Sequence, residues 1–105
     1  MTDVPLVLAA LADPTRLGAL AVLRDGREHC VCELMDRLGA TQSRMSRHMA
    51  VLRQAGLVAG RRDAQWVRYR LDPGLDPAVR RLVGAALDLV PGAAPGMTVA
   101  RELAA

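Results

Sequence analysis

The sequence predicts a mainly α-helical domain with one two-stranded β-hairpin, arranged as a winged helix-turn-helix that works as a homodimer. Three neighbouring features support this prediction. An amphipathic stretch with a cationic face runs from Thr41 to Leu57, a helical stretch ending in glycine comes immediately before it, and a basic hairpin follows it. Two short helices joined by a glycine-containing turn form a helix-turn-helix, and the hairpin supplies the wing.

Length and composition favour one small domain. The chain has 105 residues, of which 51% are hydrophobic and only 2% aromatic, so aliphatic side chains and methionine must build the core. We assign residues 1–90 to one folded, dimerising domain and residues 91–105 to a flexible C-terminal tail. The sequence has no run of 18 apolar residues and no secretory leader, so we expect a cytoplasmic protein that does not enter membranes.

Positive charge is concentrated in the middle of the chain. The formal net charge is only +3, but residues 41–72 contain seven arginines against Asp63 and Asp72, a local charge of +5. The rest of the chain has seven arginines and nine acidic residues, a charge of −2. This asymmetry favours a surface that faces a polyanion such as nucleic acid.

Two helices are expected at the N-terminal end. The stretch Val4–Ala12 is apolar nearly all round, with Pro5 in its first turn, so we expect it to be buried, partly against a second subunit. Asp13 and Pro14 then suit the cap and first position of a second helix, which ends at Asp25-Gly26. Its core stripe consists of Leu17, Leu20, Ala21 and Leu23.

A third helix is expected from Glu28 to Leu38, closed by Gly39. Apolar residues recur along it at i, i+3, i+4 and i+7, which gives one packing face. That face consists of Val31, Leu34, Met35 and Leu38. Only Ala40 and Thr41 separate this helix from the next, as a helix-turn-helix requires.

The helix from Thr41 is the candidate recognition helix. Thr41 suits its N-cap and Gly56 its C-terminus, while Met45, Met49 and Leu52 share an apolar face. The opposite face carries hydrogen-bonding groups, namely Gln42, Ser43, Arg44, Ser46, Arg47 and His48. Glutamine and arginine read base edges in the DNA major groove through paired hydrogen bonds. Taken alone, a solvated amphipathic helix explains this stretch equally well; its neighbours favour DNA binding.

Two strands are expected next, at residues 58–62 and 66–71, around a short turn. Val67, Tyr69 and Leu71 alternate with Arg68 and Arg70, so one face of the hairpin is apolar and the other cationic. Such a basic wing contacts phosphates and fixes register without reading sequence. The candidate phosphate contacts are Arg61, Arg62, Arg68 and Arg70.

The last expected helix begins at Asp76-Pro77 and ends before Pro91-Gly92. Its wide apolar stripe has little left in the chain to cover it, which suggests a dimer interface shared with the first helix. The stripe consists of Val79, Leu82, Val83, Ala86, Leu87 and Val90.

Several of these motifs, in this order and spacing, resemble the ArsR/SmtB family of winged-helix metalloregulatory repressors. They are Leu-Ala-Asp-Pro-Thr-Arg-Leu at 11–17, Cys-Val-Cys-Glu-Leu at 30–34, Gln-Ser and Ser-Arg-His within 42–48, Leu-Arg-Gln-Ala-Gly-Leu-Val at 52–58, and the wing at 61–71. The resemblance covers roughly residues 6–90. It implies a homodimer that binds double-stranded operator DNA at an inverted repeat and represses until an inducer binds.

The pair Cys30 and Cys32 resembles the family's site for trivalent arsenic or antimony, which has a third cysteine where this chain has Met35. Thiolates suit such soft ions, whereas a thioether is a weak ligand, and Met35 also lies on the predicted packing face. Two thiols suit methylarsenite, which offers two exchangeable bonds. Arsenite would need His29, water or another anion to complete the site. A zinc site on the last helix is not expected, because that helix offers Asp88 but no histidine.

Helix geometry suggests how such binding would act. In a cytoplasmic protein Cys30 and Cys32 are expected as thiols. On a regular helix residues i and i+2 point about 200° apart, so the two sulfurs cannot hold one ion unless the helix start is distorted. Such a distortion would move the adjacent recognition helix, which makes it a plausible trigger for release.

Other classes of function fit the sequence less well. A redox or other soft-metal sensor on the same DNA-binding domain is the nearest alternative, although cysteines two apart form a strained ring. A thiol enzyme is not expected, since the chain has no C-x-x-C motif on a βαβ pattern and neither histidine has an evident carboxylate partner. A pure dimerisation module would leave the polar helix face and the basic wing unexplained.

Overall fold

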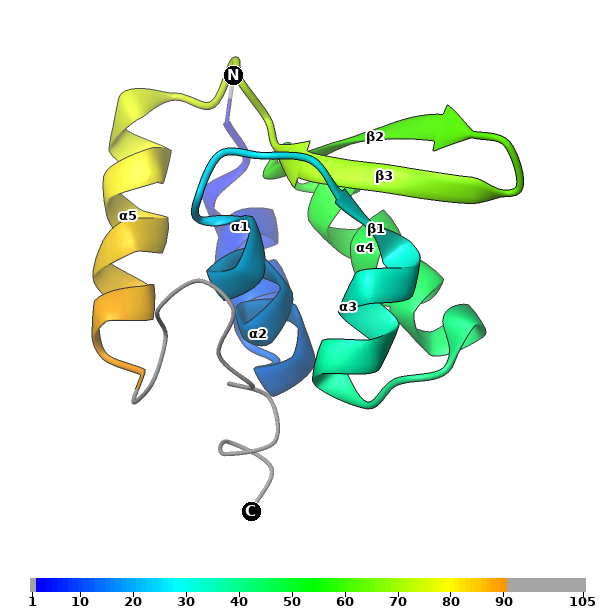
Figure 1. Ribbon diagram of the computed structural model, residues 1–105. Coiled ribbons are helices and arrows are strands. Elements are labelled where there is room, and N and C mark those ends of the chain that lie inside the picture. Colours follow the sequence, from blue (N-terminus) through cyan, green and yellow to red (C-terminus); the bar gives the residue numbers. More distant parts are fainter. Residues whose placement is uncertain (1, 91–105) are drawn as a thin grey trace.

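The computed structural model describes residues 2–90, so the predicted tail at 91–105 lies outside the described residues. The elements are α1 (Val4–Leu11), α2 (Pro14–Leu23), β1 (His29–Cys30), α3 (Val31–Leu38), α4 (Gln42–Gln54), β2 (Val58–Asp63), β3 (Trp66–Leu71) and α5 (Pro77–Asp88). The hairpin of β2 and β3 projects away from the helices, and α5 lies on the opposite side of the molecule (Figure 1). The predicted mainly helical fold with a β wing is confirmed.

Side-chain caps start α1, α2, α4 and α5 where the sequence predicted helices. Carboxylates of Asp3, Asp13 and Asp76 accept hydrogen bonds from first-turn amides of α1, α2 and α5, each of which has proline in its first turn. Thr41 caps α4 as predicted, because its hydroxyl accepts from the amide of Arg44 at 3.3 Å. Each cap satisfies an amide that the helix itself leaves unpaired.

The core consists of aliphatic side chains and methionine, as the composition required. Met45, Met49 and Leu52 of α4 are fully buried and pack with α2 and α3. Gly56 has a φ of +77°, the conformation expected of a glycine after a helix. This packing fixes the opposite face of α4 toward the outside of the molecule.

The third helix begins later than the sequence predicted. Glu28 lies outside it, and His29 and Cys30 form the short strand β1, so α3 starts at Val31. Cys30 has an extended backbone (φ −65°, ψ 143°), and its sulfur accepts from the amide of Cys32 at 3.2 Å as the helix cap. The apolar residues at helical spacing all lie at or after Val31, so this periodicity gave no evidence of helix at residues 28–30.

The sheet has three strands rather than the predicted two, in the order β1-β3-β2. β1 pairs antiparallel with β3, with His29 opposite Tyr69 and Cys30 opposite Arg68. The added strand pairs backbone groups on the outer edge of β3 that a two-stranded wing would leave open. The segment before α3 is thereby joined to the wing through the backbone.

Within the described part of the chain, no single helix is long and apolar enough to span a membrane. Helices α1 and α2 meet that criterion only as a pair, with a bend of 97° between them. The residues of α2 from Gly18 to Leu23 are buried in the core.

Candidate nucleic-acid interface and cysteine pair

The polar face of α4 is open to solvent, as a groove-binding helix requires. Gln42, Ser43, Arg44, Ser46 and Arg47 are all exposed. Because the opposite face is locked into the core by its methionines and Leu52, these side chains are presented together on one side. These five residues form the predicted polar face of α4, and the one difference from the prediction is at His48.

His48 is turned inward rather than fully toward the groove. Its side chain is 19% exposed, and its Nδ1 lies 3.1 Å from Nη1 of Arg16 and 3.8 Å from Oδ2 of Asp13. Burial lowers the pKa of His48, and the charges of nearby arginines act in the same direction, while Asp13 opposes them. The surroundings at the junction of α2 and α4 therefore favour the neutral form of His48.

Arg16 is a residue that the sequence analysis left without a role. Its Nε donates to the carbonyl of Ala10 at 2.7 Å and its Nη2 to that of Ala9 at 3.2 Å, so it satisfies carbonyls at the end of α1. The same guanidinium reaches His48. The sequence showed only that Arg16 lies outside the apolar stripe of α2. Its contact with His48 could not be predicted, because the two residues are 32 positions apart.

The four predicted wing arginines fall into two pairs. Arg62 and Arg70 are exposed, and no ion pair involves them within residues 2–90. Arg61 donates to both carboxylate oxygens of Glu28, at 2.9 and 2.8 Å, and this hydrogen bonding lowers the pKa of Glu28. Arg68 donates to Asp63 at 2.7 Å and lowers the pKa of that carboxyl in the same way.

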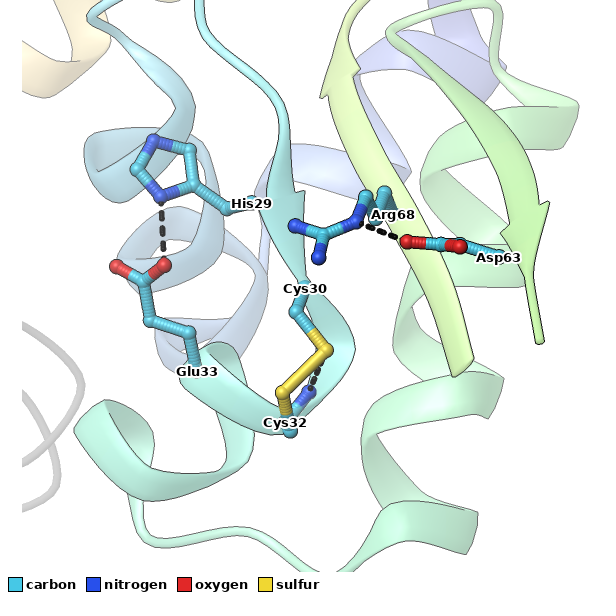
Figure 2. Close-up of a disulfide and its surroundings, with 6 residues drawn as sticks. All are labelled: His29, Cys30, Cys32, Glu33, Asp63 and Arg68. Atoms are coloured by element: carbon cyan, nitrogen blue, oxygen red, sulfur yellow. Dashed lines mark hydrogen bonds and ion pairs between the residues drawn. A yellow bond between two sulfur atoms is a disulfide. The ribbon is translucent and has the colours of Figure 1, made fainter. Parts of the chain in front are cut away.

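Cys30 and Cys32 are joined in a disulfide, with their Cα atoms 5.1 Å apart (Figure 2). The expectation of free thiols is therefore not met in this structure. The argument that a regular helix would hold the sulfurs apart was also wrong, because Cys30 lies in extended backbone before the helix and only Cys32 lies within it. Both sulfurs meet at the junction of β1 and α3 without any unwinding of the helix.

His29, which the sequence offered as an extra arsenic ligand, is occupied elsewhere. Its Nδ1 lies 3.0 Å from Glu33 and its Nε2 2.9 Å from Asp25. Carboxylates therefore flank both ring nitrogens, contrary to the expectation that neither histidine has a carboxylate partner. Figure 2 shows the ring directed toward Glu33 and away from the sulfurs. Met35 packs against the core, as predicted. Within residues 2–90, no group of three or more His, Cys, Asp or Glu side chains is arranged to hold a metal ion.

Comparison with known proteins agrees with this geometry. A family model described as "Bacterial regulatory protein, arsR family" matches residues 13–59. An arsenic resistance transcriptional regulator of Pseudomonas putida is 41% identical over 87 residues, which make up 83% of this chain and 76% of that protein. The chain belongs to the ArsR family. The arsenical resistance operon repressor of Escherichia coli is also 41% identical, over 76 residues, which are 72% of this chain and 65% of that protein.

Solved structures of ArsR-like regulators have the same fold. HlyU from Vibrio cholerae is 37% identical and superposes with a TM-score of 0.70 over 82% of this chain and 89% of that one. The antimony-specific transcriptional repressor AntR is 28% identical, with a TM-score of 0.66 over 83% of this chain and 76% of that one. For this ArsR-family chain the winged helix-turn-helix prediction is therefore confirmed.

Proposed function

We propose that this chain is a DNA-binding transcriptional repressor that leaves its operator when a trivalent arsenic or antimony compound binds reduced Cys30 and Cys32. The observation that carries the proposal is the place where the two sulfurs meet. They lie at the junction of α3, which packs on the recognition helix, and β1, which pairs with the wing. Two relatives are regulators of arsenic or arsenical resistance, and one structural neighbour is an antimony-specific repressor, which supports the choice of inducer.

DNA binding rests on two exposed cationic surfaces. The polar face of α4 suits the major groove, where arginine and glutamine pair with base edges. The free wing arginines, Arg62 and Arg70, suit phosphates on the flanking backbone. A repressor acts where its operator DNA is, so we place this chain in the cytoplasm.

The chemistry of the inducer follows from the dithiol form. Cytoplasmic thiol reductants keep such cysteines reduced. Each thiol then exchanges with one hydroxyl of methylarsenite, so two As–S bonds form, two As–O bonds break and two waters leave, with arsenic remaining trivalent. Two thiolates satisfy methylarsenite fully, whereas arsenite or antimonite keeps one oxygen ligand. Because His29 and Met35 are engaged elsewhere, the third ligand is the oxygen that the metalloid retains or a water from solvent.

The proposed route to DNA release runs through the Cys30 sulfur, whose contacts the structure shows in the disulfide form. This sulfur accepts from the amide of Cys32 and so caps α3, while the backbone of the same residue pairs with Arg68. A metalloid bound between the two sulfurs holds them farther apart than the disulfide does, which loosens the cap and shifts β1 together with the wing. A ligand that prefers this shifted arrangement draws the equilibrium away from the DNA-binding one.

A homodimer completes the proposal, because an inverted-repeat operator needs two recognition helices. The single chain itself buries Val79, Val83 and Leu87 of the stripe that the sequence left uncovered, but other apolar side chains remain exposed on α1 and α5. They are Val4, Leu6, Leu8, Leu82 and, just after α5, Leu89. Clusters of exposed leucine and valine on two terminal helices are typical of a subunit interface.

A thiol redox switch is the second candidate, and the disulfide between Cys30 and Cys32 is the observation that favours it. Hydrogen peroxide would take two electrons and two protons from the dithiol, leaving the disulfide and two waters. In this alternative the oxidised and reduced proteins differ in DNA affinity, and arsenicals act only by blocking the thiols.

The deciding experiment is fluorescence anisotropy of a labelled DNA fragment from upstream of the gene, with reduced protein bound. Methylarsenite, arsenite and antimonite are titrated in turn, and peroxide is tested separately. Release at near-stoichiometric metalloid by the wild type and Met35→Leu, but not by Cys32→Ser, supports the proposal. Release by peroxide alone supports the redox switch, and absence of DNA binding at low salt contradicts both.

A further inference from the structure

A cationic pocket lies beside the recognition helix, where α4 meets the start of α2. It has a volume of about 300 Å³ and is lined by Arg16, Arg44, Arg47, His48 and Val51. None of the lining residues is acidic; the nearest carboxylate that faces His48 is that of Asp13, which is already engaged by the amide of Arg16 at 2.9 Å. The pocket therefore gathers donors and positive charge, and its lining holds no carboxylate to neutralise that charge.

The guanidinium of Arg16 is fixed before any ligand arrives. Three of its five N–H groups are used, by the carbonyls of Ala9 and Ala10 and by Nδ1 of His48. Two N–H groups remain, one on each terminal nitrogen. A planar guanidinium held in this way loses little freedom when it binds an oxyanion, and its fork matches two oxygens of a phosphate.

The contact with Arg16 also determines the tautomer of His48. Since a guanidinium can only donate, Nδ1 accepts, and the ring proton of the neutral imidazole is on Nε2. Among the described residues Nε2 makes no hydrogen bond, yet no buried side-chain nitrogen or oxygen lacks a partner, so Nε2 is accessible. His48, which lines the pocket, thus carries an accessible N–H donor in addition to the two unused donors of Arg16.

We propose that this pocket binds one phosphate group of the DNA backbone, held by Arg16 and His48 from the buried side and by Arg44 and Arg47 from the exposed side. This inference rests on the proposed DNA-binding function and specifies how DNA is seated. It assigns Arg16 to DNA binding and moves His48 from the base-reading set to the backbone. A phosphate fixed between α2 and α4 sets the depth and register of the recognition helix in the groove.

The test is a scan of a duplex that this protein binds, in which one backbone phosphate at a time is replaced by an uncharged methylphosphonate. In the wild type, one position in each half-site should weaken binding roughly tenfold, as expected for loss of charge-assisted hydrogen bonds. In Arg44→Gln and Arg16→Lys, a methylphosphonate at that same position should cause little further loss of DNA affinity. Arg53→Gln, an exposed arginine of α4 outside the pocket, serves as the matched control and should respond like the wild type.

Thermal unfolding checks that Arg16→Lys is folded. If that variant does not fold, Arg44→Gln still tests the inference, because Arg44 is exposed and its substitution should leave the fold intact. Equal sensitivity of all variants at every position would overturn the inference while leaving the DNA-binding function intact. A second outcome would also overturn the inference. If inorganic phosphate shifts the NMR signals of the His48 ring, but no position in the methylphosphonate scan depends on Arg44 or Arg16, the pocket binds free anions and not the DNA backbone. Failure of the wild type to bind DNA at low salt would overturn the proposed function itself.

Discussion

Cys30 lies directly opposite Arg68 in the antiparallel ladder between β1 and β3. Neighbouring strands are separated by only about 4.8 Å, so a proposed sensing residue and a wing arginine 38 positions later share one backbone register. Arg68 in turn donates to Asp63 at the end of β2. The sheet therefore offers a direct route from the cysteine pair to the wing, in addition to the packing of α3 on α4.

The two roles of Cys30 are separable by substitution. Serine keeps a side-chain acceptor for the amide of Cys32, whereas alanine removes the cap, so under reducing conditions Cys30→Ala should be less stable than Cys30→Ser by about 1 kcal/mol. Both should retain DNA binding and lose release by methylarsenite. Urea unfolding and anisotropy measure the two effects, and full release of DNA from Cys30→Ser would contradict the proposed site.

Glu28 is expected to restrain the wing, because its carboxylate holds the guanidinium of Arg61 that the DNA backbone would otherwise attract. Glu28→Gln should free Arg61, tighten binding at low salt, and steepen the dependence of log affinity on log salt by about one per subunit. The control is Asp36→Asn, which removes the same charge from an exposed position of α3. If the two variants have equal salt slopes, the ion pair does not limit Arg61.

The sequence predicted most of the fold because each helix carries its own signals. Asp13 and Thr41 cap where expected, and Met45 and Met49 are buried at helical spacing. The exposure of the polar side of α4 followed from the same periodicity. These features depend on residues within a few positions of one another, which is the range over which helix caps and amphipathic stripes act.

The remaining features depend on contacts between distant parts of the chain. β1 is two residues long and is stabilised by pairing with β3, so its own sequence gives no strand pattern. The presence of β1 places Cys30 before α3, so the two sulfurs lie together and not apart as predicted for a regular helix. The pairing of Glu28 with Arg61 and of Arg16 with His48 likewise joins residues more than 30 positions apart. Local periodicity carries no information about such pairs.

The proposed dimer makes a prediction for α1 and α5. Leu8 is 50% exposed and Leu82 37% exposed in the single chain, so a glutamate at either position costs little in an isolated subunit. Buried at a subunit interface, the same charge would be unpaired and costly. We therefore expect Leu8→Glu and Leu82→Glu to be folded monomers with weakened DNA binding, as measured by sedimentation and anisotropy. A dimer that survives both substitutions would place the interface elsewhere.

His48 should make the stability of the protein depend on pH. Burial keeps its pKa in the folded state below the ordinary value of 6.5, so the unfolded chain binds a proton more readily than the folded one. Stability is then full above about pH 6.5 and declines as the pH falls toward the lower pKa of the folded state. His48→Gln should flatten this part of the curve, and the difference between the two proteins in urea unfolding isolates His48 from all other titrating groups. Parallel curves for the two proteins, or an NMR titration that gives His48 a pKa above 6.5, would show that the imidazole is not held neutral at the junction of α2 and α4.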